Sequence, residues 1–304
     1  MTALSAALSA RPEKATESGA LTAMIVGQLA VAASPILVRL TGMDPIDSAA
    51  GRMAIAVPIL IAWSLFTPAP AVRSHWNFRD ILMVILSGVA FALDLAGMHA
   101  AIALGSVTNA TFLVNLAPVI MVLAAWALFK QRPSGRQAGA LAIACLGGVA
   151  LSFDSLGRAG VDPMSDLYGI GSAVAFALYM LLVQRLRARH ASGPVMLWSS
   201  LAAALTLAPM SLAHGGFELP ASLGGLAALI ALGAVVHAFG QGLTAVGLGR
   251  LPAAVIAPFL LLQPVATAVA VPFLLGETVS LPQMVGCALI LGSLGLVRFK
   301  KAQG

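Results

Sequence analysis

Asp94 is the residue whose position most needs a chemical explanation. It lies in the stretch FALDLAGMHA and is the only acidic residue deep inside a long apolar run. A carboxylate at the centre of a bilayer is costly, so it is expected to face a polar cavity or a partner. Proton coupling and binding of a substrate amine are both open functional interpretations. The structural alternative is a pairing with Arg39, Arg52, His99 or His237.

Two histidines are also embedded in apolar sequence, His99 and His237. A histidine can titrate near neutral pH and relay protons, but an interior histidine held by hydrogen bonds is the plainer interpretation. Neither belongs to an HxxxH or HExxH pattern. Gln241 follows His237 by four residues and shares its helix face, which favours this helix as part of a cavity wall.

Pro118 and Pro264 interrupt two apolar runs at corresponding positions. Proline removes a helix hydrogen bond and frees a carbonyl, and matched interruptions in two halves of a transporter indicate a binding site. Asn115 and Gln263 lie nearby and could either bind a substrate or join helices through hydrogen bonds. The remaining candidate cavity residues are Ser34, Phe91 and Tyr179.

The composition places these residues in a membrane. Of 304 residues, 60% are hydrophobic and 9% are charged, and the mean hydropathy is +0.97. Soluble domains contain about 25% charged residues, and a soluble globule this apolar would aggregate. We therefore predict an all-helical membrane protein that crosses the bilayer many times.

Ten apolar runs predict ten spanning helices, because a spanning helix needs about 20 apolar residues. The runs do not alternate as spanning strands would. They lie near 20–41, 46–66, 80–104, 107–129, 136–153, 167–184, 194–213, 222–247, 252–275 and 282–298.

The basic residues predict the orientation. With a cytoplasmic N-terminus, the cytoplasmic segments hold all 17 Lys and Arg residues except Arg39, Arg52 and Arg158. The positive-inside rule then puts both termini in the cytoplasm. The same bias explains the net charge of +6 without a nucleic-acid partner.

Residues 104–148 and 248–295 resemble each other, and each half of the chain has five predicted helices. A unit with an odd number of helices must insert upside down the second time. Lys130-Gln131-Arg132 in the first copy and Gly276-Glu277 in the second have the opposite charges that inversion requires. We expect a cytoplasmic segment 1–19, a first repeat 20–153, an external linker 154–166, a second, inverted repeat 167–298 and a cytoplasmic tail 299–304.

Leu275-Gly276-Glu277, Leu281–Gly286 and the small residues up to Gly295 resemble the repeat of the drug/metabolite transporter superfamily, as does Arg52 with the Met-Ala-Ile-Ala that follows it. The chain is most similar to the ten-helix EamA-type branch, and in particular to exporters of aromatic and neutral amino acids of the YddG kind. Lys130-Gln131-Arg132 departs from the Gly-Glu common in the family. The resemblance implies that helices 1–4 and 6–9 surround a central cavity, with helices 5 and 10 outside.

The function expected from these features is export of small organic metabolites, most of all amino acids, across a bacterial inner membrane by alternating access. A proton-coupled exporter of drugs or organic cations is the alternative. An enzyme is not expected, because the sequence has no nucleophile elbow, zinc-ligand spacing or phosphate-binding loop. No cofactor or metal is expected, and the expected partners are a small-molecule substrate and the lipid bilayer. Stripes such as Gly97-Ala101-Gly105 are attributed to packing within a monomer.

Overall fold

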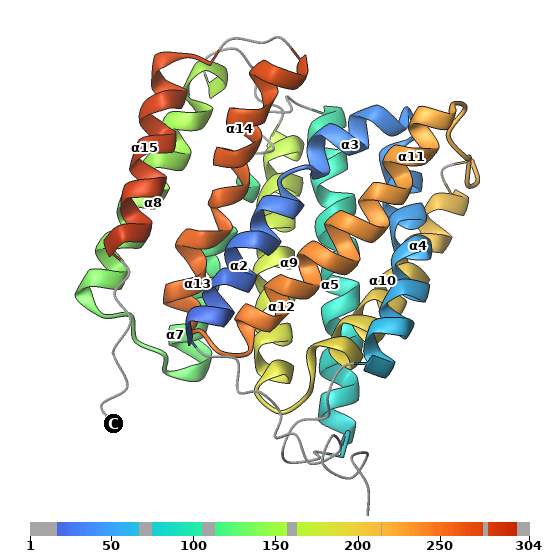
Figure 1. Cartoon of the computed structure of the whole chain (residues 1–304), viewed down its shortest axis with the longest axis horizontal. Helices are drawn as coiled ribbons and strands as arrows, with labels where there is room; N and C mark the ends of the chain where they lie inside the picture. The colour runs from blue at the N-terminus through green and yellow to red at the C-terminus, as the bar shows by residue number, and fades with distance from the viewer. Residues whose placement is uncertain are drawn as a thin grey trace, which may run out of the picture.

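The computed structural model describes residues 17–66, 75–104, 113–156, 163–213, 215–275 and 279–296, all in helices or in connections between them (Figure 1). The described helices form ten rods, five from each half of the chain. The first five are α2 (Glu17–Val31) with α3 (Ser34–Thr41), α4 (Pro45–Phe66), α5 (Phe78–Leu104), α7 (Ala117–Phe129) and α8 (Gly135–Leu156). The second five are α9 (Pro163–Arg187), α10 (Ser192–Ala213), α11 (Leu223–Ala231) with η1 (Leu232–Gln241) and α12 (Gly242–Leu248), α13 (Ala253–Leu260) with α14 (Leu262–Leu275), and α15 (Leu281–Leu296).

The ten rods confirm the all-helical prediction. In the described ranges, seven rods are long and apolar enough to cross a membrane, and 117–129, 135–151 and 281–296 are shorter apolar helices. Large apolar side chains also cover the outside of the bundle, such as Leu82, Ile85 and Leu93 on α5. An apolar exterior suits a protein whose surrounding solvent is lipid.

The helix ends differ in places from the prediction. α8 continues to Leu156 and α9 begins at Pro163, so helix occupies both ends of the predicted linker 154–166. The rods predicted at 20–41, 222–247 and 252–275 are not single regular helices. The first and third are broken, and the second contains the π-helical segment η1.

The packing interleaves the two halves in a symmetric way. α5, the third rod of the first half, packs on α9, the first rod of the second half. Correspondingly, η1, in the third rod of the second half, packs on α2, in the first rod of the first half. α5 with α10 and η1 with α4 form a second such pair. α8 packs on α15, the fifth rod against the fifth, at one side of the bundle (Figure 1). Because each half has five rods, the second half runs antiparallel to the first, as an inverted repeat requires.

Glycines allow the closest of these contacts. A Cβ on Gly88 would lie 2.3 Å from the backbone oxygen of Ser199, so α5 and α10 touch through their backbones. The side-chain hydroxyls of Ser87 and Ser199 are 3.0 Å apart in the same interface. Gly147 and Gly286 bring α8 and α15 together in the same manner. Small residues at close helix crossings are typical of membrane bundles.

The α5–α10 contact predicts that Gly88→Ala destabilises the protein. The added methyl group meets backbone atoms that cannot rotate away, and overpacking of this kind costs about 1–3 kcal/mol. The matched control is Gly171→Ala on α9, where a Cβ meets nothing within 4 Å. We expect the thermal midpoint in detergent to fall by several degrees in the first variant only. Equal midpoints for the two variants would contradict this packing.

Candidate substrate-binding site

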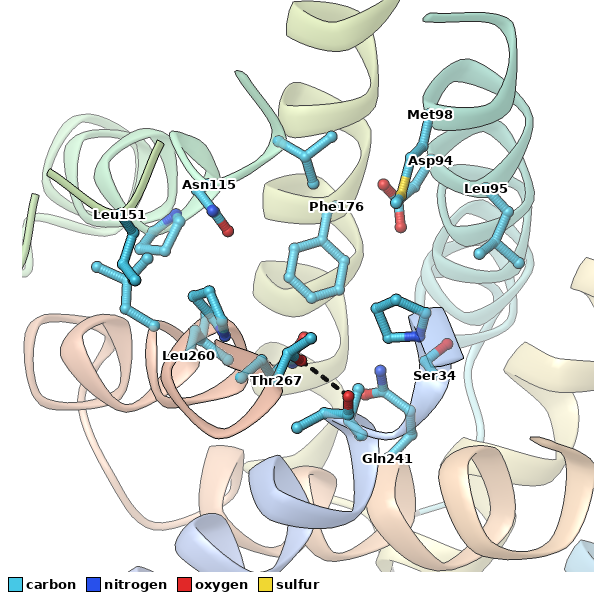
Figure 2. Close-up of a pocket in the computed structure, with 18 of the residues that line it drawn as sticks. Ser34, Asp94, Leu95, Met98, Asn115, Leu151, Phe176, Gln241, Leu260 and Thr267 are labelled. Atoms are coloured by element: carbon cyan, nitrogen blue, oxygen red, sulfur yellow. Dashed lines mark hydrogen bonds between the residues drawn. The ribbon is translucent and has the colours of Figure 1, made fainter. Parts of the chain in front are cut away.

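A cavity of about 420 Å³ lies between the two halves of the bundle (Figure 2). Asp94 of α5, Phe176 of α9 and Asn115 before α7 extend into it from different sides. Every rod except α10 contributes a lining residue, and α8 and α15 contribute one each, Leu151 and Gln283. The resemblance implied that helices 5 and 10 pack outside, yet each contributes one lining residue, while helix 7, implied to help surround the cavity, contributes none. The lining includes the predicted residues Ser34, Phe91, Asp94, Asn115, Pro118, Gln241, Gln263 and Pro264.

Breaks in three rods meet at this cavity. α2 ends at Val31, and Pro35 stands in the first turn of α3. Pro118 stands in the first turn of α7, and Pro264 follows the break between α13 and α14. Irregular backbone at membrane depth is tolerated where it is buried in protein or lines a cavity. The matched prolines therefore mark the cavity, and the break in the first rod is an addition that sequence reasoning missed.

The freed backbone groups at the first break are partly satisfied by side chains. Thr267 of α14 donates its hydroxyl to the Ala32 carbonyl at 2.9 Å, the hydrogen bond drawn in Figure 2. This bond joins the first rod of one half to the fourth rod of the other. Side-chain hydrogen bonds of this kind keep some of the freed backbone carbonyls paired when the broken helices move at the cavity.

Asp94 is buried and accepts a hydrogen bond from the Ser172 hydroxyl of α9 at 2.7 Å. In the described ranges, no Lys, Arg or His nitrogen lies within 4.0 Å of its carboxylate, since both ion pairs found there involve Asp80. None of Arg39, Arg52, His99 and His237 therefore forms a direct ion pair with Asp94, and of these four only the Arg52 charge acts on the Asp94 carboxylate from a longer distance. Asp94 lies ten residues before the end of α5, about 15 Å along the helix and so near the middle of a bilayer core.

The amide side chains divide between two roles. Gln263 donates to Gln28 at 2.6 Å, and Gln28 donates to Thr244 at 2.8 Å, so these three residues join α14, α2 and α12. Gln263 still contributes to the cavity lining, as do Asn115 and Gln241. The buried Gln241 Oε1 has no hydrogen-bond partner among the described residues. Gln263 thus acts at least partly as a helix-joining residue, while Gln241 keeps an acceptor free.

Three predicted residues lie outside the cavity lining: His99, Tyr179 and His237. His99 is half-buried on α5. The Tyr179 hydroxyl points to the Met196 sulfur at 3.8 Å, and its ring packs on Phe91 with centroids 4.7 Å apart. His237 contacts the Ser200 hydroxyl at 2.7 Å.

His237 and Gln241, which were predicted to share a face, both belong to the π-helical η1. The i→i+5 hydrogen bonds of a π-helix place more residues in each turn than an α-helix has. A spacing of four residues is still close to one turn, so the two residues differ in their contacts and not in their side of the helix. Gln241 reaches the cavity, and His237 reaches α10 through Ser200.

Arg52 is the charged lining residue that the sequence-based site omitted. The sequence placed it near the outer end of a helix, yet it is only 5% exposed. Its surroundings in the sequence, Ser48-Ala49-Ala50-Gly51, are small residues that let neighbouring helices approach closely. That composition is the signal that could have indicated burial.

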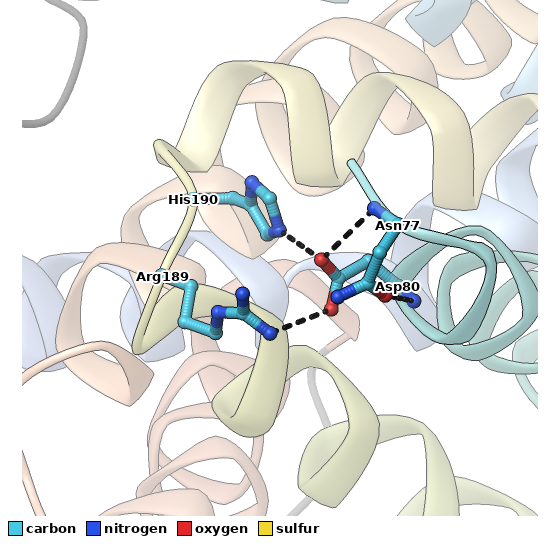
Figure 3. Close-up of polar contacts among 4 residues, drawn as sticks. All are labelled: Asn77, Asp80, Arg189 and His190. Atoms are coloured by element: carbon cyan, nitrogen blue, oxygen red, sulfur yellow. Dashed lines mark hydrogen bonds and ion pairs between the residues drawn. The ribbon is translucent and has the colours of Figure 1, made fainter. Parts of the chain in front are cut away.

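Polar contacts join the start of α5, the end of this helix away from Asp94, to the α9–α10 connection (Figure 3). Asp80 is 1% exposed, and its carboxylate lies 3.0 Å from His190 Nε2 and 3.5 Å from Arg189 in the α9–α10 connection. Asn77 and Asp80 also exchange two backbone-to-side-chain hydrogen bonds that cap α5. Trp76 stacks on His190 with ring centroids 4.2 Å apart. This cluster joins the two halves of the chain.

Two further side chains hold the same end closed. Gln184 donates to the Leu251 carbonyl at 2.9 Å, and Arg187 donates to the carbonyls of Ala245 and His190. All of these contacts must break or move if this end of the bundle is to open. In the described residues, no group of three or more His, Cys, Asp or Glu side chains could hold a metal ion.

The fold and the cavity together define a polytopic membrane protein with two related halves around a central site, an architecture of many secondary transporters. The model of the EamA-like transporter family matches residues 18–153 and 163–299, which is most of both halves. The chain therefore belongs to the EamA-like transporter family and is not an enzyme. No curated protein is significantly similar to it. A solved crystal structure, described only as that of a protein, superposes on this chain with a TM-score of 0.75 and 21% sequence identity. The match covers 92% of this chain and 96% of that one, and it supports the fold.

The Asp80 cluster predicts that Asp80→Ala lowers thermal stability, because it removes the carboxylate that His190, Arg189 and the α5 cap share. Losing a buried charged acceptor of this kind costs about 1–3 kcal/mol. The control is Arg189→Gln, since Arg189 is 53% exposed and a surface ion pair contributes little. Thermal midpoints in detergent check this, and a larger loss in the Arg189 variant would contradict it.

Proposed function

We propose that this chain is a secondary transporter that exports amino acids, above all aromatic and neutral ones, by alternating access. Membership of a transporter family supports the general class. The basic residues support an orientation with both termini in the cytoplasm. In this orientation the cavity lies toward the outer face, and the Asp80 cluster closes the cytoplasmic end.

The observation that carries the proposal is the Asp94 carboxylate, which lines the cavity and forms no ion pair within 4.0 Å among the described residues. Its one described hydrogen bond, from Ser172, leaves Oδ2 able to accept a donor. A substrate ammonium group supplies both a positive charge and three donors. The apolar lining, including Leu95, Leu260 and Phe176, suits the side chain of a neutral amino acid.

Alternating access is supported by the positions of the helix breaks and of the contacts that join the two halves. The breaks beside Pro35, Pro118 and Pro264 let the outer parts of three rods move relative to their inner parts. A substrate from the cytoplasm reaches the cavity only after the Asp80 cluster and the Gln184 and Arg187 contacts separate. Binding at the cavity is therefore expected to shift the balance between these two arrangements.

A proton-coupled exporter of organic cations is the second candidate. The same unpaired carboxylate at Asp94 supports it, because an acid in an apolar site can bind either a proton or a cation. This candidate differs from the first in needing no site for a substrate carboxylate.

Uptake into proteoliposomes tests the proposal. Labelled phenylalanine, leucine and a wider panel of amino acids are supplied with and without an imposed pH gradient. We expect saturable uptake by the wild-type protein and at least about a tenfold loss in Asp94→Asn, because the substrate ammonium loses its counter-charge. Asp44→Asn is the control, since Asp44 is exposed and caps α4, a role that asparagine also fills. Folded wild-type protein that transports no amino acid would refute the proposal.

Pro118→Ala and Pro264→Ala are expected to impair uptake more than folding. Alanine restores a backbone N–H and lets helix continue through each break, which stiffens the cavity wall. We predict about a tenfold loss of uptake, as for other small displacements of binding groups, with the thermal midpoint lowered by no more than about 3 °C. Wild-type uptake in both variants would show that these breaks do not take part in transport.

A further inference from the structure

Arg52 presents a buried positive charge that the proposed function has not yet used. It lies seven residues into α4, is 5% exposed and lines the cavity. In the described ranges, no carboxylate oxygen lies within 4.0 Å of its guanidinium. An arginine at membrane depth normally faces a counter-charge or a polar cavity, because leaving it unpaired is costly. In the described structure no carboxylate pairs with Arg52 directly, and its guanidinium lines the cavity instead.

The guanidinium is only weakly held by the protein. Nη1 lies 3.4 Å from the Ser34 hydroxyl and Nη2 lies 3.5 Å from His237 Nδ1, both longer than most hydrogen bonds. The buried Nε has no partner among the described residues. Since a guanidinium offers five N–H donors, most of its capacity is left for a ligand.

His237 orients this guanidinium and cannot itself be the anion site. Arginine has only donors, so the contact with Arg52 requires His237 Nδ1 to accept. The ring proton then sits on Nε2 and is donated to Ser200 at 2.7 Å. Both ring nitrogens are thereby occupied, which leaves Arg52 as the cationic donor facing the cavity.

Phe91 connects Arg52 to Asp94. The Arg52 Cζ lies 5.4 Å from the centroid of the Phe91 ring. Phe91 and Asp94 are three residues apart on α5, so their Cβ atoms are about 5–6 Å apart on one helix face. All three residues line the cavity. A guanidinium and a carboxylate thus occupy neighbouring positions on one wall without pairing to each other.

We propose that Arg52 binds the carboxylate and Asp94 the ammonium group of one zwitterionic substrate, so that the cavity selects α-amino acids over organic cations. The inference rests on the proposed function and decides between its two candidates. Guanidinium and carboxylate form strong charge-assisted hydrogen bonds, often two at once. The substrate side chain is then left to the apolar lining around Leu260 and Phe176.

Selection arises from the cost of leaving either protein charge unpaired. An amine without a carboxylate pairs with Asp94 but leaves Arg52 with its weak contacts. A carboxylic acid without an amine leaves Asp94 with Ser172 alone. A site built to pair a substrate group rejects analogues that lack it, because its own buried group is left unsatisfied.

Competition against labelled phenylalanine uptake tests this inference with three ligands of similar shape: phenylalanine, phenethylamine and 3-phenylpropionate. Leucine, 3-methylbutylamine and 4-methylpentanoate form a second set. For the wild-type protein we expect each amino acid to compete at least about tenfold more strongly than its amine or its acid. An amine that competes as strongly as its parent amino acid would overturn the proposal without any variant.

The variants assign the two charges. In Arg52→Gln, we expect phenylalanine to lose at least about tenfold in affinity, measured by ligand-induced thermal stabilisation, while phenethylamine changes less than about twofold. Asp94→Asn should weaken phenylalanine and phenethylamine together and leave 3-phenylpropionate unchanged. Arg39→Gln is the control, since Arg39 is exposed at the end of α3.

Arg52→Lys guards against loss of the fold, because it keeps the charge but loses the two-pronged geometry. It should bind phenylalanine with an affinity between those of the wild-type and Gln proteins. Equal weakening of phenylalanine and phenethylamine in folded Arg52→Gln or Arg52→Lys protein would overturn the Arg52 assignment while amino-acid transport stands. No uptake and no stabilisation by any amino acid in wild-type protein would instead overturn the proposed function, and this inference with it.

Discussion

The bundle buries two opposite charges, Arg52 and Asp94, that form no ion pair with each other. The rest of the structure has to offset the cost of burying them. Burying a charge in a medium of low dielectric constant is costly unless hydrogen bonds or a counter-charge compensate it. Here the protein compensates each charge only in part, with Ser34 and His237 at Arg52 and with Ser172 at Asp94. These partners come from three different rods, so the charges constrain how α3, η1 and α9 are arranged around α4 and α5.

Buried charges that are only partly compensated also need a polar space beside them, and the breaks in the rods supply that space. A continuous helix satisfies its own backbone and packs closely against its neighbours, which leaves no room for a ligand. The breaks beside Pro35, Pro118 and Pro264 interrupt that packing at one level of the bundle. Thr267 and Gln263 of α14 then link this rod to the broken first rod through hydrogen bonds to Ala32 and Gln28. The cavity is therefore a consequence of local backbone chemistry placed at three points in an otherwise regular bundle.

Hydropathy could predict the ten rods because lipid imposes the same length and apolarity on every spanning helix. Polar residues inside apolar runs could likewise be placed at the cavity, as Asp94, Asn115 and Gln241 are. The failures have specific physical causes. Arg52 is close to a helix end along the chain, but burial depends on neighbouring rods that sequence position does not reveal. His237 and Tyr179 lie outside the lining and contact Ser200, Met196 and Phe91, and such tertiary contacts cannot be read from the sequence.

The symmetry of the fold is broken by its charges. The rods of the second half that correspond to α4 and α5 are α10 and α11–η1–α12, and neither contains Asp, Glu, Lys or Arg. Both charges of the cavity thus belong to the first half, while Gln241, Gln263 and the apolar Leu260 come from the second. A zwitterion held by Arg52 and Asp94 would stay attached to one half as the other moves across it. In that arrangement the second half can move between two positions while the substrate keeps both of its charged partners. The transition that carries the substrate then avoids the free-energy cost of separating these charges inside the membrane.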